Sequence, residues 1–492
     1  MLLSELLKEC RTDLSDCVIT GNTDIEISGL AYDSRSNVGS GTLFACFSGR
    51  SFDGHVYAED VVNRGASCLL VSKEVSLPSD ACVTIIKCSD VRYVFAFLSA
   101  AFYGNPGEKL RVIGITGTKG KTTSAFMTQA ILNKAGISCG LVGTVHIDTG
   151  KRIIEAEHTT PEALELQQYF REMVENGLQA VVMEVSSLAL KMHRTQGFTF
   201  EIGLLTNLSP DHIGGNEHDS FEEYAQCKKL LFKQCRQAIA NKDDAHFESM
   251  TEGIPCPLYT FSIDGRADLM ASRLTRFFED GMLGIEFTAS GSYEGDIRLS
   301  LPGNFSVYNA LTAMSIAHFM GVRKETIGEV LSKITIPGRI EMIPVSDSFT
   351  LMIDYAHNAV SLESLLTTLR KHEPGRLVTL FGCGGNRDRK RRFEMGEVSG
   401  RLSDFTIITS DNPRFEEPSA ILDDIETGIR ATGGAYVRIE DRRDAIRFAI
   451  ENGQPGDIIV IAGKGQETYQ EIKGIKYPMD ERIIIREILA EK

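Results

Sequence analysis

The 492-residue chain contains no tryptophan and has fewer basic than acidic side chains, 52 against 67, for a formal net charge of -15. This charge makes long nucleic-acid polyanions poor partners, so we expect no nucleic-acid ligand. A nucleotide is still possible, because a phosphate site needs only backbone N–H groups and a few cations. With 42% hydrophobic residues, the chain can bury several cores.

Signals for secretion, disulfides and membrane insertion are also missing. The eleven cysteines are scattered, and none lies in a CxxC pair or has the spacing of a zinc site. The N-terminus, MLLSELLKECRTD, lacks the basic start and apolar segment of a signal peptide. No apolar run is long enough to span a bilayer. We therefore expect a cytoplasmic protein with reduced thiols and no membrane span, and we expect a monomer.

The length predicts about three domains. Turn-forming residues at 104–109 (GNPGEK) and a Pro-Gly turn at 336–339 divide the chain into domains at 1–105, 106–336 and 337–492. The fold class is α/β: an N-terminal α/β domain, a central P-loop domain with a mostly parallel sheet, and a Rossmann-like C-terminal domain. Residues 258–301, with short strands and glycine turns, predict antiparallel hairpins.

In the third domain, polar clusters follow the predicted strands. The strands are expected at 351–354, 377–381, 406–409 and 458–461, and the clusters at 354–357, 382–392, 410–414 and 462–467. Ligands of doubly wound sheets bind beyond the carboxyl ends of the strands. These clusters are therefore candidates for a binding site.

A glycine-rich turn between a predicted strand (110–116) and a predicted helix (122–134) has the pattern of a phosphate-binding loop. Backbone N–H groups and the helix dipole favour phosphate there, Lys121 can reach terminal phosphates, and the Thr122 hydroxyl can ligate Mg²⁺. Ile115 stands where the general pattern has glycine, so the loop is a variant. It predicts ATP binding by Gly117, Thr118, Lys119, Gly120, Lys121, Thr122 and Thr123.

Three further motifs follow this loop: Thr159-Thr160-Pro161, Met183-Glu184-Val185-Ser186-Ser187 and Asn207-Leu208-Ser209-Pro210-Asp211-His212. Together with the variant loop, they make the chain resemble the Mur ligases along essentially its whole length. The resemblance implies an enzyme of peptidoglycan precursor synthesis, with ATP phosphorylating the glutamyl carboxylate of UDP-MurNAc-L-Ala-D-Glu. The amine of a diamino acid then attacks the acyl phosphate, and an amide, ADP and phosphate result.

The resemblance also implies the catalytic and metal-binding groups. Lys121 would act on the phosphates, and two Mg²⁺ ions would be held by Thr122, Glu184, His212 and Lys228. Lys228 would carry a carbamate, which turns a cation into a metal-binding anion. Taken by itself Lys228 is a helix-surface lysine, and the adjacent Lys229 leaves the register open.

Further matches concern the two nucleotides. The UDP-substrate would be held by Ser34, Thr159, Thr160, Ser186 and Arg194, with the uridine in the first domain near Asp33-Ser34-Arg35 and Asp53-Gly54-His55. The matches for ATP outside the loop are Asn304, Asn309, Arg339, Asp354 and His357, the last three in a domain expected to close and exclude water.

The incoming amino acid would be bound by Arg387, Asp411, Asn412, Arg414, Gly463 and Glu467. An arginine can grip a carboxylate, and a carboxylate can pair with an ammonium. Family members with Asp-Asn-Pro-Arg at this place mostly add meso-diaminopimelate, and lysine-adding members usually lack the arginine. The resemblance, with Arg414 and Glu467, therefore favours meso-diaminopimelate over L-lysine or another diamino acid. The alternative for Arg414 is an ion pair with Glu416 or Glu417.

Some positions depart from the family pattern, namely Leu188, Met192, Gln466 and the loop at 213–220. They leave the substrate details open but spare the ATP and Mg²⁺ machinery. Three other functions also remain open. They are a folylpolyglutamate synthase, which normally lacks a separate first domain, an amide ligase outside wall synthesis, and a P-loop regulatory protein without ligase activity.

Overall fold

The structure is a computed structural model that describes residues 1–49, 52–79, 81–211, 213–214, 217–279 and 282–491. The chain divides into two compact units: Met1–Met270 with Leu311–Thr326, and Ala271–Ala310 with Ile327–Lys492. The division passes through strand β14 (Leu269–Glu279) and helix α9 (Asn304–Phe319). The three domains expected from the sequence stay a prediction.

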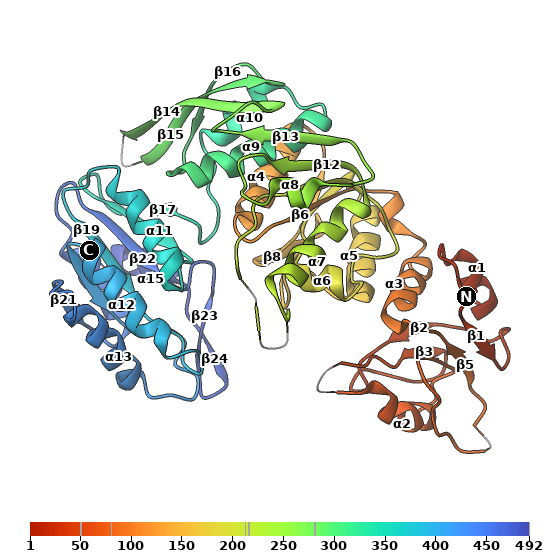
Figure 1. Cartoon of the computed structure of the whole chain (residues 1–492). Helices are drawn as coiled ribbons and strands as arrows, with labels where there is room; N and C mark the ends of the chain where they lie inside the picture. The colour runs from red at the N-terminus through yellow and green to blue at the C-terminus, as the bar shows by residue number, and fades with distance from the viewer. Residues whose placement is uncertain (50–51, 80, 212, 215–216, 280–281, 492) are drawn as a thin grey trace. The chain divides into compact units, whose positions relative to one another are not determined.

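The N-terminal part of the first unit is built on a five-stranded sheet of described residues, in the order β1-β5-β4-β3-β2 (Figure 1). Side chains of β3 alternate between two cores, because successive residues of a strand point to opposite faces. Leu43 packs with helices α1 and α3, and Phe44 packs with α2. The elements are β1 (Val18–Thr20), β2 (Gly29–Ala31), β3 (Thr42–Ala45), β4 (Cys68–Val71), β5 (Thr84–Lys87), α1 (Leu3–Glu9), α2 (Ala58–Asn63), α3 (Val91–Phe102), and the 3-10 turns η1 (Gly54–Tyr57) and η2 (Pro106–Glu108).

The largest sheet has the order β16-β15-β14-β13-β12-β11-β6-β10-β7-β8-β9 among the described residues. Its centre is β6 (Arg111–Thr116), which pairs in parallel with β10 (Ala180–Glu184) and β11 (Phe200–Leu205). Helix α4 (Lys121–Lys134) follows β6 directly. The remaining elements are β7 (Cys139–Val142), β8 (His146–Asp148), β9 (Ile153–Glu155), α5 (Ala163–Glu175), α6 (Ser187–Lys191), α7 (Phe221–Lys233), α8 (Phe247–Thr251) and α10 (Lys324–Leu331).

The prediction of antiparallel hairpins at 258–301 is wrong for the first strand of that segment. β15 (Met282–Gly291) and β16 (Gly295–Leu299) do pair antiparallel. However, β13 (Leu258–Ser262) pairs in parallel with β12 (Cys235–Asn241) and with β14. The glycine turns indicated hairpins, but β13 extends the parallel sheet because β12, which the sequence did not predict, lies beside it.

The second unit contains a six-stranded sheet of described residues, in the order β17-β18-β22-β19-β20-β21. All its neighbours pair in parallel except β17 with β18, as predicted for a Rossmann-like domain. Helices α11, α12 and α13 lie next to one another, while α14 and α15 pack together in a core with the sheet (Figure 1). The elements are β17 (Glu341–Ile343), β18 (Thr350–Asp354), β19 (Leu377–Phe381), β20 (Phe405–Ile408), β21 (Tyr436–Arg438), β22 (Ile458–Ala462), α11 (Ala359–Arg370), α12 (Lys390–Leu402), α13 (Pro418–Arg430), α14 (Arg442–Glu451), α15 (Glu481–Ala490), and a hairpin of β23 (Tyr469–Ile472) and β24 (Ile475–Pro478).

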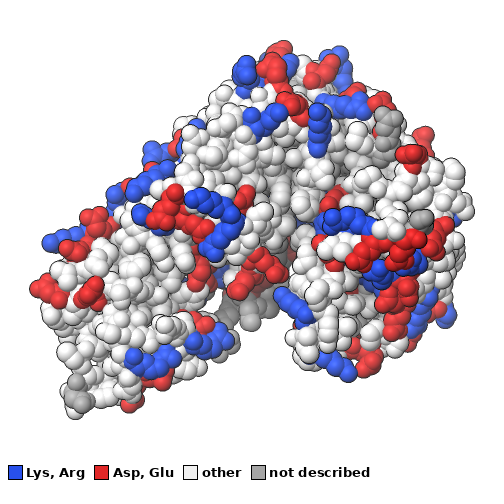
Figure 2. All heavy atoms as spheres, turned by 180° about the vertical axis from the view of Figure 1, so that it is seen from behind, with Lys and Arg blue, Asp and Glu red and all other residues white. Residues whose placement is uncertain are grey.

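Acidic and basic side chains are interspersed over the face drawn in Figure 2. Among the described helices, none combines the length and the apolarity that a bilayer crossing requires.

A buried ion pair ties the sheet of the second unit to its helices. Arg442 and Glu481 lie 2.7 Å apart, and their side chains are 2% and 0% exposed. The other guanidinium nitrogens donate to the carbonyls of Ser410 and Ala462, just beyond β20 and at the end of β22. Arg442 therefore fixes the two strand ends at which polar clusters were predicted.

We expect Arg442→Met to lower the free energy of unfolding by about 3–5 kcal/mol, because it leaves the Glu481 carboxyl buried without its partner. Arg443→Met is the matched control, since Arg443 is the next residue of α14 and pairs with Glu487 at the surface. Solvent screens that pair, so the control should unfold close to the wild type. Urea unfolding of both variants measures the difference, and a wild-type midpoint for Arg442→Met would refute this role.

Candidate functional site

The phosphate-binding loop connects the central strand β6 to helix α4. Gly117 has a φ of +143° and Gly120 a φ of +87°, and Gly120 is the residue that precedes α4. Glycine reaches these conformations without steric cost. The first turn of α4, Lys121–Thr123, therefore opens at the end of the strand, where its N–H groups lack intrahelical partners. This is the geometry of an anion site, as the sequence predicted.

Contacts with the segment after β11 hold this loop in place. Thr118 N–H donates to the carbonyl of Asn207, and Lys119 N–H donates to its side-chain oxygen, both at 2.9 Å. The Thr206 hydroxyl donates to the carbonyl of Lys119 at 2.7 Å. A side chain on Gly117 would place Cβ 1.9 Å from the Thr206 Oγ1. Only glycine therefore fits at this position of the loop.

Two lysines converge on the carbonyl oxygen of Gly117. The Nζ of Lys121 and the Nζ of Lys228 each donate to it at 2.9 Å. Lys228 comes from helix α7, is 2% exposed and lies with its Nζ 4.6 Å from the centre of the Tyr224 ring. Burial, and then the neighbouring Lys121, hold the pKa of Lys228 well below its ordinary value.

This environment separates Lys228 from its neighbour in the sequence. Lys229 is half-buried, and its Nζ donates to the carbonyl of Ser249 at 2.8 Å. Lys228 is thus the one of the two that faces the phosphate loop. Its residue type and helical position alone predict a surface lysine, and that prediction is wrong.

Glu184 ends strand β10 beside the phosphate loop and is 1% exposed. Its carboxylate accepts hydrogen bonds from the Thr122 hydroxyl at 2.9 Å, the Thr144 N–H at 2.8 Å and the Thr144 hydroxyl at 3.2 Å. The Thr122 and Glu184 oxygens therefore form an adjacent pair of oxygen donors, which is the ligand type that Mg²⁺ selects. The sequence did not predict the contribution of Thr144.

The residues expected to hold the UDP-substrate surround the end of β10. Thr159 shares a hydrogen bond with Thr144, and the Thr160 hydroxyl donates to the carbonyl of Glu184 at 2.9 Å. The Thr160 oxygen also accepts from the N–H of Ser186 at 3.0 Å. Arg194 donates to the carbonyl of Thr160 at 3.0 Å. These four residues are therefore brought together in the first unit.

Much of the Arg194 guanidinium is already engaged. It pairs with Glu162 at 2.6 Å, and Glu162 also pairs with Arg92 at 3.2 Å. Among the described residues, the buried Nε atoms of both arginines have no hydrogen-bond partner. Arg194 thus keeps some capacity for a further acceptor.

In the N-terminal part, Ser34 lies in a turn in which Arg35 pairs with Asp33. The second motif folds around a buried histidine. His55 Nε2 accepts from the N–H of Ser72 at 3.0 Å, so Nδ1 carries the proton toward Asp53, 2.7 Å away. The contacts within this motif therefore fix the turn itself.

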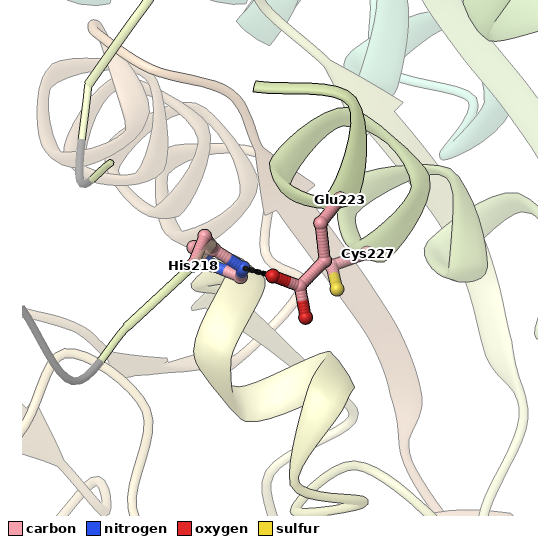
Figure 3. A group of neighbouring side chains, drawn as sticks. All are labelled: His218, Glu223 and Cys227. Carbon is pink, nitrogen blue, oxygen red and sulfur yellow. Dashed lines mark ion pairs between the residues drawn. The ribbon is translucent and has the colours of Figure 1, made fainter. Parts of the chain in front are cut away.

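His212, which was predicted to bind a metal, lies outside the described residues. The same loop leads to His218, which points toward Glu223 and Cys227 of α7 (Figure 3). His218 Nε2 lies 2.8 Å from the Ser187 hydroxyl, while its Nδ1 lies 4.0 Å from Glu223. Glu223 already pairs with Lys191 at 2.6 Å. The Glu223 charge is therefore balanced without an ion, and the cluster connects α7, which carries Lys228, to the loop and to α6.

In the second unit, Asp354 at the end of β18 organises the residues expected on the ATP side. Its carboxylate accepts from the N–H of Ile340 at 2.9 Å and of Ala356 at 2.8 Å, and burial raises its pKa. The Arg339 guanidinium lies 4.5 Å from the centre of the Tyr355 ring, which also contacts the ring of His357. Arg339, Asp354 and His357 thus form one group. At the start of α9, Asn304 is exposed and Asn309 is buried.

Two glycines place this group against the loop that carries Glu467. A Cβ on Gly338 would lie 2.2 Å from the N atom of Gln466. A Cβ on Gly465 would lie 2.8 Å from the Cβ of Tyr355, and Gly465 has a φ of +54°. The two backbone segments touch directly, without side chains between them.

The residues expected to bind the amino acid meet beyond the ends of β18, β20 and β22. Gly463, with a φ of +112°, donates its N–H to the carbonyl of Asp354 at 3.1 Å. A Cβ on Gly463 would lie 3.0 Å from the Asp411 carboxylate. Asn412 donates to Glu467 at 2.8 Å. The polar clusters therefore come together, as the parallel topology predicted.

Arg414 does not pair with either of the acids considered from the sequence. Its Nε pairs with Glu471 of the hairpin at 3.1 Å, and its Nη1 donates to the carbonyl of Gly385 at 2.7 Å. Glu416 instead pairs with Arg392. The exposed Arg387 lies near the same glycine: a Cβ placed on Gly384 would lie 3.2 Å from Arg414 Nη1 and 3.9 Å from Arg387 Cγ.

The departures from the expected pattern lie at the edges of these groups. Leu188 and Met192 belong to the short helix α6 and the residue that ends it. Gln466 has a buried side-chain oxygen with no hydrogen-bond partner in the described part of the chain. In the loop at 213–220, Gly214 donates its N–H to the carbonyl of His218 at 2.8 Å.

Comparison with known proteins gives consistent matches along the chain. Residues 115–317 match the Mur ligase middle domain, and residues 338–465 match the Mur ligase, glutamate ligase domain. A UDP-N-acetylmuramoyl-L-alanyl-D-glutamate–2,6-diaminopimelate ligase from Caldanaerobacter subterraneus subsp. tengcongensis is 42% identical, over 100% of this chain and 99% of that protein.

Solved structures match as well. A UDP-N-acetylmuramoyl-L-alanyl-D-glutamate–2,6-diaminopimelate ligase is 29% identical with a TM-score of 0.72, covering 100% of this chain and 99% of that one. A folylpolyglutamate synthase from Mycobacterium tuberculosis, at 19% identity and a TM-score of 0.58, covers 74% of this chain and 91% of that one. The second likeness is one of fold alone.

We expect Gly117→Ala to raise the KM for ATP at least tenfold, because the added Cβ displaces Thr206 and with it the loop carbonyls. The matched control is Gly136→Ala, at a φ of +82° but with no atom within 4 Å of the added Cβ. Both variants bear the cost of a left-handed alanine, about 1–2 kcal/mol. A KM for ATP that rises equally in both would show that the close approach at Gly117 is unimportant.

Proposed function

The chain belongs to the Mur ligase family, and on that basis we propose that it adds meso-diaminopimelate to UDP-MurNAc-L-Ala-D-Glu. It is an ATP-dependent ligase that forms an amide bond and releases ADP and phosphate. The observation that carries the choice of amino acid is a chain of contacts that connects Arg414 to Glu467 in the second unit. Arg414 pairs with Glu471, the Glu471 N–H donates to the Asn412 side chain, and Asn412 donates to Glu467. An arginine and a carboxylate match the carboxylate and the ammonium at the distal end of diaminopimelate.

For the first chemical step, the phosphate loop and Lys121 would hold the phosphates of ATP. Thr122 and Glu184 would hold Mg²⁺, since their oxygens are adjacent and buried beside the loop. The ion, when bound, supplies positive charge that offsets the charge of the transferred phosphoryl group. The Nζ of Lys121 donates to the carbonyls of Gly117 and Thr118. A change of side-chain rotamer would bring it to the phosphates instead.

For the second metal position we propose a carbamate on Lys228, together with His212. The neutral amine attacks the carbon of CO₂, one C=O π bond opens toward its oxygen as the C–N bond forms, and the nitrogen loses a proton to solvent, so that a carboxylate-like anion replaces the amine. Burial lowers the pKa of Lys228 and so favours its neutral amine, which supports this modification. The anion would also lie close to the Lys121 cation, which favours it electrostatically.

The remaining predicted site residues would bind the three substrates. Thr159, Thr160, Ser186 and Arg194 would bind the UDP-substrate, and Ser34 the uridine side. Asn304, Asn309, Arg339, Asp354 and His357 would serve ATP, while Arg387, Asp411, Asn412, Arg414, Gly463 and Glu467 would serve the amino acid. The amine attacks the acyl phosphate, so both sets of residues are needed for one turnover. The monomeric state and the cytoplasmic location remain predictions.

Phosphate release with UDP-MurNAc-L-Ala-D-Glu, ATP and a panel of meso-diaminopimelate, L-lysine, L-ornithine and D-lysine tests the function. We expect kcat/KM for meso-diaminopimelate to exceed that for L-lysine by about tenfold or more, the value of one charged hydrogen-bonded pair. Folate with glutamate serves as the control for the rival ligase reaction. No release with any diamino acid would refute the proposed function, and a preference for lysine would refute the role of Arg414.

Lys228→Ala should lose nearly all activity, because neither the amine nor its carbamate is left beside the phosphate loop. Added short carboxylic acids should restore part of it by occupying the space of the carbamate. Lys229→Ala is the matched control and should keep wild-type activity, since the Nζ of Lys229 donates to the carbonyl of Ser249 and not to the phosphate loop. A fully active Lys228→Ala would exclude the carbamate.

The pH dependence of the free energy of unfolding gives a second test of the buried state of Lys228. Its pKa in the folded chain is below the ordinary lysine value, so the unfolded chain binds the proton more tightly. The contribution of this residue to the free energy of unfolding is therefore largest above the ordinary pKa, and it falls as the pH decreases through that range toward the folded value. In protein kept free of CO₂, so that the amine is unmodified, the Lys228→Ala variant should show a weaker dependence of the unfolding midpoint on alkaline pH than the wild type.

A further inference from the structure

The second unit contains a lysine that the proposed reaction has not used. Lys464 lies between Gly463 and Gly465 just beyond β22, and it is 0% exposed. Burying an ammonium without partners costs several kcal/mol, so a lysine in this position needs strong acceptors. Its Nζ has two: the side-chain oxygen of Asn412 at 3.0 Å and Oε2 of Glu467 at 2.9 Å.

These three side chains form a closed triangle. Asn412 donates its amide N–H to the same Oε2 of Glu467 at 2.8 Å. The side-chain oxygen of Asn412 also accepts from the N–H of Glu471, at 2.9 Å. Every contact of the triangle therefore converges on one oxygen of Glu467 and one oxygen of Asn412.

The other oxygen of Glu467 is left for a ligand. Oε1 has no hydrogen-bond partner among the described residues, and the side chain is 21% exposed. Lys464, by contrast, is fully enclosed and has the ring of Tyr469 5.6 Å from its Nζ. A substrate can therefore reach Glu467 but not Lys464.

We propose that Lys464 is a positioning residue for the amino-acid substrate: it fixes Glu467 so that Oε1 meets the ammonium of the incoming diamino acid. This inference rests on the proposed function and deepens it. A glutamate has three rotatable side-chain bonds, and its entropy must be lost when it binds a ligand. Lys464 and Asn412 hold the carboxylate in one orientation before the substrate arrives, so binding no longer carries that cost.

The orientation matters more than the charge. Lys464 partly offsets the negative charge of Glu467 and so weakens its attraction for any cation in general. Lys464 instead fixes the orientation of the Glu467 carboxylate. Because Oε2 is occupied, only Oε1 is presented to the substrate. Selectivity for an amine at one defined distance follows from this arrangement.

The test compares Lys464→Met with the wild type in the phosphate-release assay. We expect the KM for the amino acid to rise about tenfold to a hundredfold, the effect of losing one or two charged hydrogen bonds. The KM for ATP should stay within about twofold, since the hydrogen bonds of the Lys464 side chain within the described part of the chain go to Asn412 and Glu467 and not to ATP-side residues. Lys476→Met is the matched control: its Nζ lies 4.1 Å from the same Tyr469 ring but outside the triangle. It should behave as the wild type.

A double-mutant cycle with Glu467→Gln separates positioning from general damage. If Lys464 acts through Glu467, the Lys464→Met/Glu467→Gln variant should have nearly the same KM for the amino acid as Glu467→Gln alone. Additive effects, an unchanged KM for the amino acid in Lys464→Met, or an equal rise in the KM for ATP would each overturn the proposal. Should Lys464→Met fail to fold, Lys464→Gln, which keeps a donor without the charge, gives the same comparison.

Assaying the wild type alongside distinguishes a failure of the Lys464 role from a failure of the proposed ligase function. Amino-acid-dependent phosphate release by the wild type, with no effect of Lys464→Met, overturns only the role of Lys464. No release by the wild type with any amino acid overturns the proposed function and this inference with it.

Discussion

The carbonyl oxygen of Gly117 accepts hydrogen bonds from two lysines, and the chemistry of the first unit depends on this contact. In the proposed function, Lys121 would act as a cation for phosphate, while Lys228 would have to be neutral to react with CO₂. Burial, and then the repulsion between the two ammonium groups that share one carbonyl, lower the pKa of Lys228 and favour its neutral form. The absence of a side chain on Gly117 makes room for the arrangement, since Thr206 occupies the space of a Cβ.

The second unit solves a different problem, namely how to keep polar groups oriented where parallel strands end. Arg442 holds the carbonyls of Ser410 and Ala462, and Lys464 holds Asn412 and Glu467. Both cations are buried, and both use their donors on protein acceptors. Charged hydrogen bonds from these two cations therefore hold the strand-end carbonyls, Asn412 and Glu467 in fixed positions.

Local patterns predicted the elements that carry the site. The phosphate loop was recognisable because the glycine positions, a preceding strand and a following helix all lie in one continuous segment, residues 110–134. The gathering of Asp411, Gly463 and Glu467 followed from the parallel order of strands alone. Partners chosen by tertiary packing could not be predicted in this way. The burial of Lys228 depends on how α7 packs beside the loop, and the pairing of Arg414 with Glu471 depends on a hairpin 57 residues further along the chain.

Lys464 was missed for a related reason. It lies inside the cluster at 462–467 that the sequence did single out, but a lysine between two glycines reads as an exposed turn residue. Only the enclosure by Asn412, Glu467 and Tyr469 shows otherwise. Similarly, the sequence of 258–262 predicts part of a hairpin, but in the structure this segment pairs in parallel with strand β12, which was not predicted.

The contact between Gly338 and the Gly465–Gln466 backbone has a consequence for the energetics of binding. Arg339 follows Gly338, and Glu467 follows Gln466. Two backbone segments that carry residues proposed for different substrates are therefore in direct contact, with no side chains between them. A displacement of either backbone segment would be transmitted to the other, whereas the loss of a side-chain contact that leaves the backbone in place, such as that of Lys464, would not be. The affinities for nucleotide and amino acid would then be thermodynamically linked, each ligand changing the affinity for the other by the same factor. Ordered substrate addition in such a protein requires no dedicated regulatory element.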